Sequence, residues 1–346
     1  MHVTTIGIDL AKNIFQVHGV DSHGHAVLRK QLKRQQLHTY FANLPPCLIG
    51  MESCCGAHFH ARRLEALGHT VKLMAPQFVK PYVKTNKNDA NDAEAICEAV
   101  ARPNMRFVPA KSAEQQAVLM MHRAREGLIG QRTGQVNQIR GLLMEFGFVF
   151  PKGIAVARAL IPAVLADETN ELPPRARQLF RRLFEHLREL DSQVEELEEQ
   201  LRVWHRDDAA SQRLRQIPGI GYLTATALVA SIGDVRSFRN GRQMAAWLGL
   251  VPKQYSSGGK QVLGRISKRG DTYLRKLLIV GARAVLRHLK AKPGQDPTWI
   301  DRLVARRHSN VAAVALANKN ARIAWALLAH DREYRADWRR PEVQAA

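Results

Sequence analysis

Short runs of apolar and β-branched residues alternate with amphipathic stretches through residues 1–110. The runs that predict strands are HVTTIGIDLA, FQVHGV, AVLRKQL, CLIGM and VKLM. The stretches that predict helices are AHFHARRLEALG, which Gly68 ends, and DANDAEAICEAVA. Strands that alternate with helices in this way predict a mixed α/β sheet with helices on its faces.

Two long amphipathic stretches follow, at residues 112–146 and 175–204, each with apolar residues at helical spacing. The second has near-heptad spacing with charges on its other faces, so the two can pair as an antiparallel coiled coil. A connection containing Pro and Gly, around Pro151–Pro174, joins them. We interpret this part as a helical arm that serves as a spacer or a dimer contact.

The pattern changes again from about residue 211. Two helices flank the Gly-rich turn IPGIG, and GRQMAAWLGL predicts another helix. A Gly/Ser-rich loop, PKQYSSGGK, then precedes a basic loop, a helix and the final helix NVAAVALANKNARIAWALLAH. The chain is therefore divided into 1–110, an arm at 111–206, and a mostly α C-terminal domain at 207–346.

Composition excludes several classes of protein. Of the 346 residues, 45% are hydrophobic, which is too many for a disordered basic tail. No apolar run reaches the ~18 residues of a membrane span, and no secretory leader opens the chain. The four cysteines (Cys47, Cys54, Cys55, Cys97) form neither a disulfide scaffold nor a zinc pattern. We therefore expect a soluble protein of a reducing compartment, with a polyanionic partner.

The positive charge is unevenly distributed. Lys and Arg total 52 against 31 Asp and Glu, a net charge of +21. Residues 207–346 hold 25 basic and 10 acidic residues, so they contribute 25 − 10 = +15. A basic module beside a near-neutral one is typical of binding to a phosphate backbone. The alternative is a basic surface that only aids solubility.

Four acids stand out as candidate metal ligands. Asp9 and Glu52 each end a predicted strand, and Asp89 and Asp92 lie three residues apart at a helix start, on one helix face. Converging carboxylates suit Mg²⁺ or Mn²⁺, and two such ions can clamp the oxygens of a phosphoryl transfer. The alternatives are structural: Asp89 as a helix N-cap, Asp92 as a first-turn acid, and Glu52 as a solvated strand end.

Two further segments are candidates for contact with nucleic acid. In the loop Ser256-Ser257-Gly258-Gly259, two glycines let a hydroxyl approach a phosphate closely. The cations around it are Lys253, Lys260, Arg265, Lys268 and Arg269. The IPGIG turn resembles a helix–hairpin–helix, in which Arg215, Gly219 and Gly221 would contact DNA phosphates. A solvated loop and a plain αα-hairpin are the structural alternatives.

Taken together, these motifs carry a family resemblance. IGIDLAK, GMESCCGAHFHARRLEALGH and KTNKNDANDAEAI resemble the RuvC-like domain of DEDD insertion-sequence transposases. The stretch from IPGIG through WLGLVPKQYSSGGK to GDTYLR is similar to that family's second transposase domain. The resemblance extends from about Ile6 to Leu286, in the same order.

The resemblance implies a RuvC-like (RNase H-like) N-terminal domain and a recombinase that moves its own element. It implies that Asp9, Glu52, Asp89 and Asp92 hold divalent metal and that a serine in the second domain is the nucleophile. That serine is Ser257, with Ser256 as a one-residue alternative. The implied partners are donor and target DNA and an element-encoded guide RNA, and the implied location is a bacterial-type cytoplasm, in association with the nucleoid. Self-association as a dimer or tetramer is expected from the helical arm.

Three functions remain as alternatives at this point. The first is a DNA transposase or recombinase that uses metal and serine. The second is a structure-specific nuclease of Holliday-junction type, in which water attacks and the serine is dispensable. The third is a nucleic-acid-binding protein in which all four acids are dispensable. The serine loop and the charge of +15 on residues 207–346 favour the first.

Overall fold

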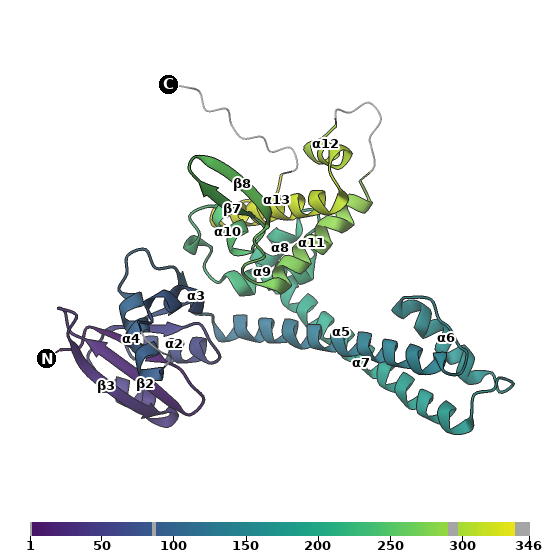
Figure 1. Cartoon of the computed structure of the whole chain (residues 1–346), viewed down its shortest axis with the longest axis horizontal. Coiled ribbons are helices and arrows are strands. Elements are labelled where there is room, and N and C mark those ends of the chain that lie inside the picture. Colours follow the sequence, from purple (N-terminus) through teal and green to yellow (C-terminus); the bar gives the residue numbers. More distant parts are fainter. Residues whose placement is uncertain (1, 85–87, 290–296, 336–346) are drawn as a thin grey trace. The chain divides into compact units, whose positions relative to one another are not determined.

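The computed structural model describes residues 2–84, 88–289 and 297–335 (Figure 1). The chain forms two compact units, each with its own core. The first contains Met1–Gln116 together with Ala230–Asn240. The second contains Ala117–Val229 and Gly241–Ala346.

The first unit is built on a mixed six-stranded sheet in the order β3-β2-β1-β4-β5-β6. The antiparallel pairs are β1 with β2, β2 with β3, and β5 with β6, whereas β4 runs parallel to both β1 and β5. The predicted mixed α/β sheet is therefore confirmed. The strands are β1 Thr5–Asp9, β2 Ile14–Val20, β3 Ala26–Lys33, β4 Leu48–Glu52, β5 Thr70–Met74 and β6 Phe107–Val108.

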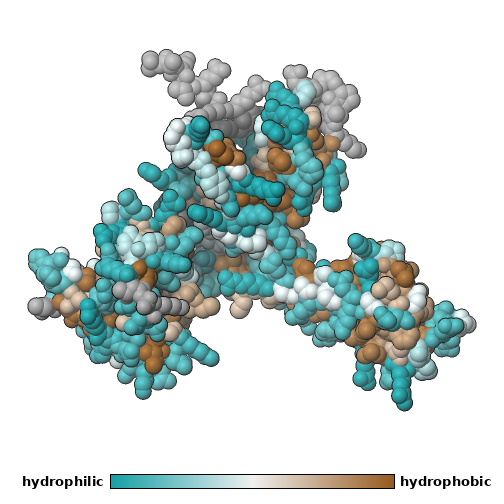
Figure 2. Space-filling view, in the orientation of Figure 1, coloured by the Kyte–Doolittle hydropathy of each residue, from teal (hydrophilic) through white to brown (hydrophobic). Residues whose placement is uncertain are grey.

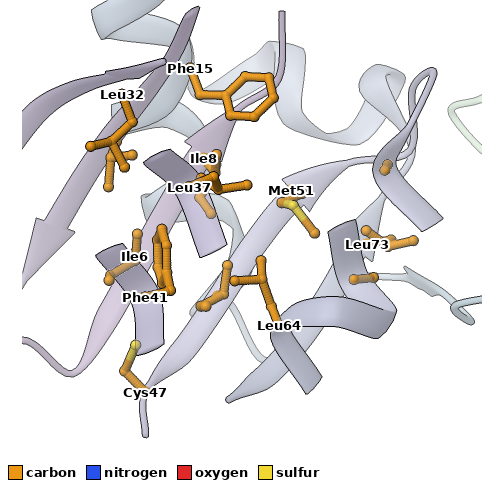
Figure 3. Packing of buried hydrophobic residues seen from close by; sticks show 14 residues of the cluster. Ile6, Ile8, Phe15, Leu32, Leu37, Phe41, Cys47, Met51, Leu64 and Leu73 are labelled. Carbon is orange, nitrogen blue, oxygen red and sulfur yellow. The ribbon is translucent and has the colours of Figure 1, made fainter. Parts of the chain in front are cut away.

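Helices cover both faces of this sheet. Side chains from α1 (Leu37–Ala42) and α2 (Ala57–Ala66) pack with the inward residues of the strands on one face (Figure 3). The short α3 (Pro76–Val79) and α4 (Asp89–Val100) form a second cluster with Met74. Alternation along each strand supplies the two faces, because neighbouring side chains point in opposite directions. The first cluster includes Ile6, Ile8, Phe15, Leu37, Phe41, Met51 and Leu64.

The arm consists of three helices rather than the two that were predicted. These are α5 (Ala113–Met144), α6 (Ile154–Ala166) and α7 (Pro174–Asp207). Ion pairs Arg125–Glu198 and Arg132–Asp191 join α5 to α7 in antiparallel order. The supposed Pro/Gly connection contains α6, because Ala157, Ile161 and Leu165 recur at helical spacing and bury one face of it. Its internal Pro162 does not prevent the helix.

The remaining part of the second unit is mostly helical, as predicted. A two-stranded antiparallel sheet interrupts the helices where a Gly/Ser-rich loop was predicted. The elements are α8 Ala209–Arg215, α9 Tyr222–Ile232, α10 Gly241–Trp247, β7 Pro252–Ser257, β8 Lys260–Ile266, α11 Thr272–Arg287, α12 Trp299–Arg306 and α13 Ser309–Ala329.

Two findings bear on the predictions from composition. All four cysteines are free thiols: Cys47 and Cys97 are buried, whereas Cys54 and Cys55 are exposed. Among the helices in the described ranges, none combines the length and the apolar character needed to cross a membrane.

A buried histidine joins three helices of the second unit. Nδ1 of His122 lies 2.9 Å from the Tyr273 hydroxyl, and Nε2 lies 3.0 Å from Oγ1 of Thr226. Oγ1 of Thr226 donates to the carbonyl of Tyr222, so it accepts from the imidazole. Burial, with a smaller contribution from the charge of Arg125, lowers the pKa of His122 to about 4. The ring is therefore neutral in the folded protein at pH 7.

This depressed pKa predicts a loss of stability in acid. The unfolded chain binds a proton at this histidine near pH 6.5 and the folded chain only near pH 4, so stability falls as the pH drops through that window. Between pH 7 and pH 5 the free energy of unfolding should fall by ~2 kcal/mol through this group. Urea titrations of His122→Gln should lack this part of the pH dependence. His186→Gln, at an exposed position on α7, should retain it.

Candidate active site

Strand pairing brings two of the predicted acids to one edge of the sheet. In the parallel pair β1–β4, Ile6 pairs with Ile49, Gly7 with Gly50, and Ile8 with Met51. Residues 6–9 and 49–52 therefore have the same pattern, isoleucine, glycine, an apolar residue and an acid, and they lie side by side in the sheet. Asp9 and Glu52 follow at the carboxyl ends of neighbouring strands, where their side chains emerge together.

Two glycines allow α4 to lie directly on these strands. A Cβ at Gly7 would be 2.2 Å from the carbonyl oxygen of Ala93, and a Cβ at Gly50 would be 2.7 Å from Cβ of Val100. Any larger residue at Gly7 would push the helix off the sheet, because the clash is with backbone. The close approach positions the first turn of α4, which contains Asp89 and Asp92, near the end of β1.

The structure brings three of the four acids together, and the fourth, Glu52, lies at the neighbouring strand end. Ligand oxygens of Asp9, Asp89 and Asp92 lie within 4.8 Å of one another. Burial raises the pKa of Glu52, and the negative charges of Asp9 and Asp92 raise it further. Glu52 is therefore close enough to these two acids for their charges to act on it. The N-cap of α4 is Asn88, whose side chain accepts from the amide of Ala90, so the structural alternative of Asp89 as N-cap is wrong.

This set of donors fits a hard divalent cation. Carboxylate oxygens are the ligands that Mg²⁺ and Mn²⁺ take in proteins. Burial is the main cause of the raised pKa of Glu52, and repulsion by Asp9 and Asp92 adds to it. A bound cation would relieve that repulsion. Asp9, Glu52, Asp89 and Asp92 are the residues that would hold it.

One functional contact has no signal in the sequence motifs. Arg34, directly after β3, clamps the turn that follows Asp9. Its Nε donates to the carbonyl of Lys12 at 2.8 Å, and its Nη2 donates to the carbonyl of Ala11 at 3.3 Å. Its guanidinium also lies over the Phe15 ring. Arg34 thereby fixes the backbone next to the first acid of the cluster.

A neutral histidine supports this arginine. Nη1 of Arg34 lies 3.4 Å from Nε2 of His60, which is buried. Burial, and then the charges of His38 and Arg34, lower the pKa of His60 to about 4. A neutral His60 ring accepts a hydrogen bond from Arg34 at Nε2. Its Nδ1 donates a hydrogen bond to Nε2 of His38, 3.3 Å away. This orientation is possible only while His60 stays unprotonated.

Ser257 lies at the end of an exposed β-hairpin rather than in an irregular loop. β7 and β8 pair Ser257 with Lys260 and Ser256 with Gln261. Gly258 and Gly259 form the turn with φ of +55° and +78°, the left-handed conformation that a two-residue hairpin turn requires. Every residue of β7 is exposed.

The hairpin distinguishes the two candidate serines. Neighbouring residues on a strand point to opposite faces, so Ser256 and Ser257 do not share one. Nε2 of Gln254 donates to Oγ of Ser256 at 2.9 Å. Within the described ranges, no such contact holds the hydroxyl of Ser257. Its neighbour Tyr255 is 64% exposed.

The predicted cations surround this hairpin on the surface. Lys253, Lys260 and Arg265 are exposed strand residues, and Lys268 and Arg269 are exposed in the turn before α11. Arg275, which no motif indicated, is buried beneath that turn and donates to the carbonyls of Leu248 and Arg269, each at 3.1 Å. It fixes the backbone from which the exposed cations project.

The IPGIG segment forms the turn between α8 and α9. Gly219 has φ of +90° and packs against α11, where a Cβ on Gly281 would be 1.8 Å from the carbonyl oxygen of Gly219. Asn320 donates to the carbonyl of Pro218 at 2.8 Å. Arg215 and Gly221 are exposed. One side of the turn thus packs against α11 and α13, and Arg215 and Gly221 lie on the solvent-exposed side.

Acids at two neighbouring strand ends and in the first turn of the helix above them, in a strongly basic chain, are typical of an enzyme that processes nucleic acid. Comparison with known proteins identifies the family. A profile of DEDD transposases of IS110 type matches residues 6–148. The profile described as "Transposase IS116/IS110/IS902 family" matches residues 211–297. The chain belongs to this family of insertion-sequence transposases, and the resemblance found in the sequence is confirmed.

Individual relatives agree along nearly the whole chain. A probable family 20 transposase of Pseudomonas aeruginosa is 56% identical over 97% of this chain and 99% of its own length. The transposase for insertion sequence element IS1328 of Yersinia enterocolitica is 48% identical over 94% and 96%. The transposase for IS1111A of Coxiella burnetii is 44% identical over 96% and 92%.

Proposed function

We propose that this transposase excises and inserts its element by DNA strand exchange through a covalent serine intermediate. The observation that carries the proposal is the convergence of Asp9, Asp89 and Asp92 within 4.8 Å, with Glu52 at the end of the neighbouring strand. It is tested by the loss of exchange when these acids or Ser257 are replaced. The nuclease alternative is not favoured, because the matching families and relatives are transposases.

The proposed reaction has two balanced steps. Oγ of Ser257 attacks the phosphorus of a DNA phosphodiester, the hydroxyl proton passes to solvent, and one strand end leaves as a free hydroxyl. A hydroxyl of the new partner strand then attacks the phosphoserine and releases Ser257. The number of phosphoester bonds is conserved, so rejoining needs no external energy source.

The chain's acids and cations have separate roles in this scheme. A divalent ion held by the four acids would polarise phosphate oxygens and favour deprotonation of an attacking hydroxyl. Lys253, Lys260 and Arg265 stabilise the negative charge that develops on the phosphate. Arg34 keeps the turn after Asp9 in place. We further propose that an element-encoded RNA selects donor and target DNA by pairing.

DNA binding should depend strongly on salt, because the cations of residues 207–346 displace counterions from phosphates. With ~6 phosphates contacted, affinity should fall ~10³-fold between 50 and 200 mM salt. Lys260→Gln and Arg265→Gln should each lower the slope of log K against log salt by ~1. Arg181→Gln, at an exposed position on the nearly neutral arm, should leave it unchanged. A flat titration of the wild type would remove the phosphate-binding role from this segment.

The arm should support self-association. Its end, where α5 leads to α6, exposes apolar side chains, among them Val149 (74% exposed), Met144 and Leu179, and Figure 2 shows apolar surface there. Val149→Glu combined with Leu179→Glu should convert dimers to monomers in sedimentation velocity, because charge at an apolar interface is desolvated without a partner. Met120→Glu is the control, because Met120 is an exposed apolar residue near the other end of α5. A wild type that sediments as a monomer with and without DNA would contradict this role.

A further inference from the structure

Polar side chains continue from the acidic cluster across the sheet. In the antiparallel pairs, Asp9 lies opposite Gln16, and Gln16 lies opposite Gln31. Directly opposed residues project from the same face of a sheet. A row therefore extends from Asp9 on β1 over β2 to the edge strand β3, and a second pair, His18 with Arg29, lies beside it on the same face.

The rows form one wall of a cavity. The cavity has a volume of about 260 Å³. Lys30 lines it, but the ammonium of Lys30 lies 4.6 Å from the centre of the Tyr40 ring, on the opposite face of the sheet. The other polar lining residues are Gln16, His18, Arg29, Gln31, Asn91 and Glu94. The last two come from α4, which lies close to β1 at Gly7. Two of its lining residues are direct neighbours of the acids: Gln16 is the strand partner of Asp9, and Asn91 precedes Asp92 in α4.

The lining favours a neutral ligand with several hydrogen-bonding groups. Gln16, Gln31 and Asn91 are carboxamides, each with donors and an acceptor, which is the combination that recognises the edge of a nucleobase. Arg29 adds a planar set of donors. Glu94 opposes a bound phosphate, and one carboxylate among three carboxamides is a poor cation site. Burial lowers the pKa of His18, whose ring is consequently neutral.

The position limits which base can occupy the cavity. Neighbouring strands lie ~4.8 Å apart, so Gln31 is about 10 Å from Asp9 across two strand spacings. That span matches the step from a phosphate to the base of the adjoining nucleotide. A base unstacked from its duplex can enter a protein cavity and be read along its pairing edge.

We propose that this cavity binds the base of the DNA nucleotide next to the phosphodiester held at the four acids. It gives the transposase a direct contact with sequence at the exchange position, separate from pairing with RNA. The proposal rests on the proposed function, because it takes the acids as the place where DNA is processed.

Photocross-linking of the full-length chain tests this assignment. The probes are duplexes with the end of the chain's own element, each with 5-iododeoxyuridine at one position near the exchange site. Matched RNA transcripts of the element carry 5-iodouridine. Adducts are mapped by mass spectrometry. One or two adjoining DNA positions should cross-link to residues 14–33, which include His18.

Variants determine whether the cavity is responsible. Gln16→Ala with Arg29→Ala should lower this cross-link about 5-fold or more, the loss of one bidentate contact. Gln31→Trp, which fills the cavity from an exposed strand position, should do the same. Arg63→Ala is the matched control: Arg63 is an exposed arginine on α2, which packs on the opposite face of the sheet. Cross-links to residues 207–346 should be unchanged in all variants.

Each outcome bears on the proposal. DNA cross-links confined to residues 207–346, or unchanged in the double variant, would overturn it. Cross-linking of residues 14–33 only to iodouridine in the RNA would assign the cavity to RNA instead. The assay needs no strand cleavage, so Ser257→Ala should keep the cross-link. If the protein forms this cross-link but no covalent adduct at serine, the base-binding role of the cavity is supported and only the serine mechanism is refuted.

Discussion

Ser257→Ala should abolish covalent attachment of the protein to DNA and reduce strand exchange by more than about 10³-fold, as loss of a nucleophile does. DNA binding should stay normal, since the side chain lies on an exposed hairpin and the nearby cations are retained. The measurement is capture of the protein–DNA adduct under denaturing conditions, followed by peptide mapping. Ser257→Cys should retain slow attack, because a thiol is also a nucleophile.

Ser256→Ala is the matched control for this result. The two serines are adjacent on β7, both are exposed, and they lie on opposite faces of the hairpin. The hydroxyl of Ser256 already accepts a hydrogen bond from Gln254. We therefore expect Ser256→Ala to lower the rate of strand exchange only slightly. An adduct that maps to Ser256 would move the assignment by one residue. Cut strands with free ends and no adduct would place this transposase among the enzymes in which water attacks.

Asp9→Asn and Asp92→Asn should each eliminate strand exchange without unfolding the chain. Each removes a charged oxygen ligand from a cluster whose members lie within 4.8 Å. In metal-free buffer the acids repel one another, so these variants and Glu52→Gln should melt at or slightly above the wild-type temperature. In the wild type, Mn²⁺ at 100 times its dissociation constant should stabilise the fold by about 2.7 kcal/mol.

Thermal melts with and without Mn²⁺ separate a metal role from a structural one. The three variants should lose the Mn²⁺-dependent stabilisation together with exchange. Glu65→Gln, which removes an exposed acid from α2, should keep both. Full exchange by the wild type in EDTA, or by the Asp9→Asn, Asp92→Asn double variant, would remove divalent metal from the mechanism.

Several errors in the sequence-based prediction have a common cause. Residues 252–266 were predicted as a loop because glycine and serine are frequent in loops, yet paired glycines with left-handed φ make a tight hairpin turn. The region before Pro174 was predicted as a connection because it contains proline, yet Ala157, Ile161 and Leu165 bury a helical face. In both segments, contacts between residues prevailed over the preferences of single residues.

What the sequence alone determined about this transposase is local. Alternating apolar positions placed β1 and β4 and showed that each ends in an acid, and helical periodicity placed α4, α5 and α7. Charge counting placed the excess in residues 207–346. These properties depend on neighbours within a few residues, so they can be recognised without knowing the fold. They were sufficient to indicate the family.

The tertiary structure alone decided how those pieces meet. Gly7 and Gly50 fall in register only because β1 pairs in parallel with β4, and α4 can then bring Asp89 and Asp92 to Asp9. Arg34 reaches the turn after Asp9 only because β3 returns beside β2. The row from Asp9 through Gln16 to Gln31 likewise exists only in the strand register. Each is a contact between residues distant in sequence, set by backbone pairing and close packing that no local pattern encodes.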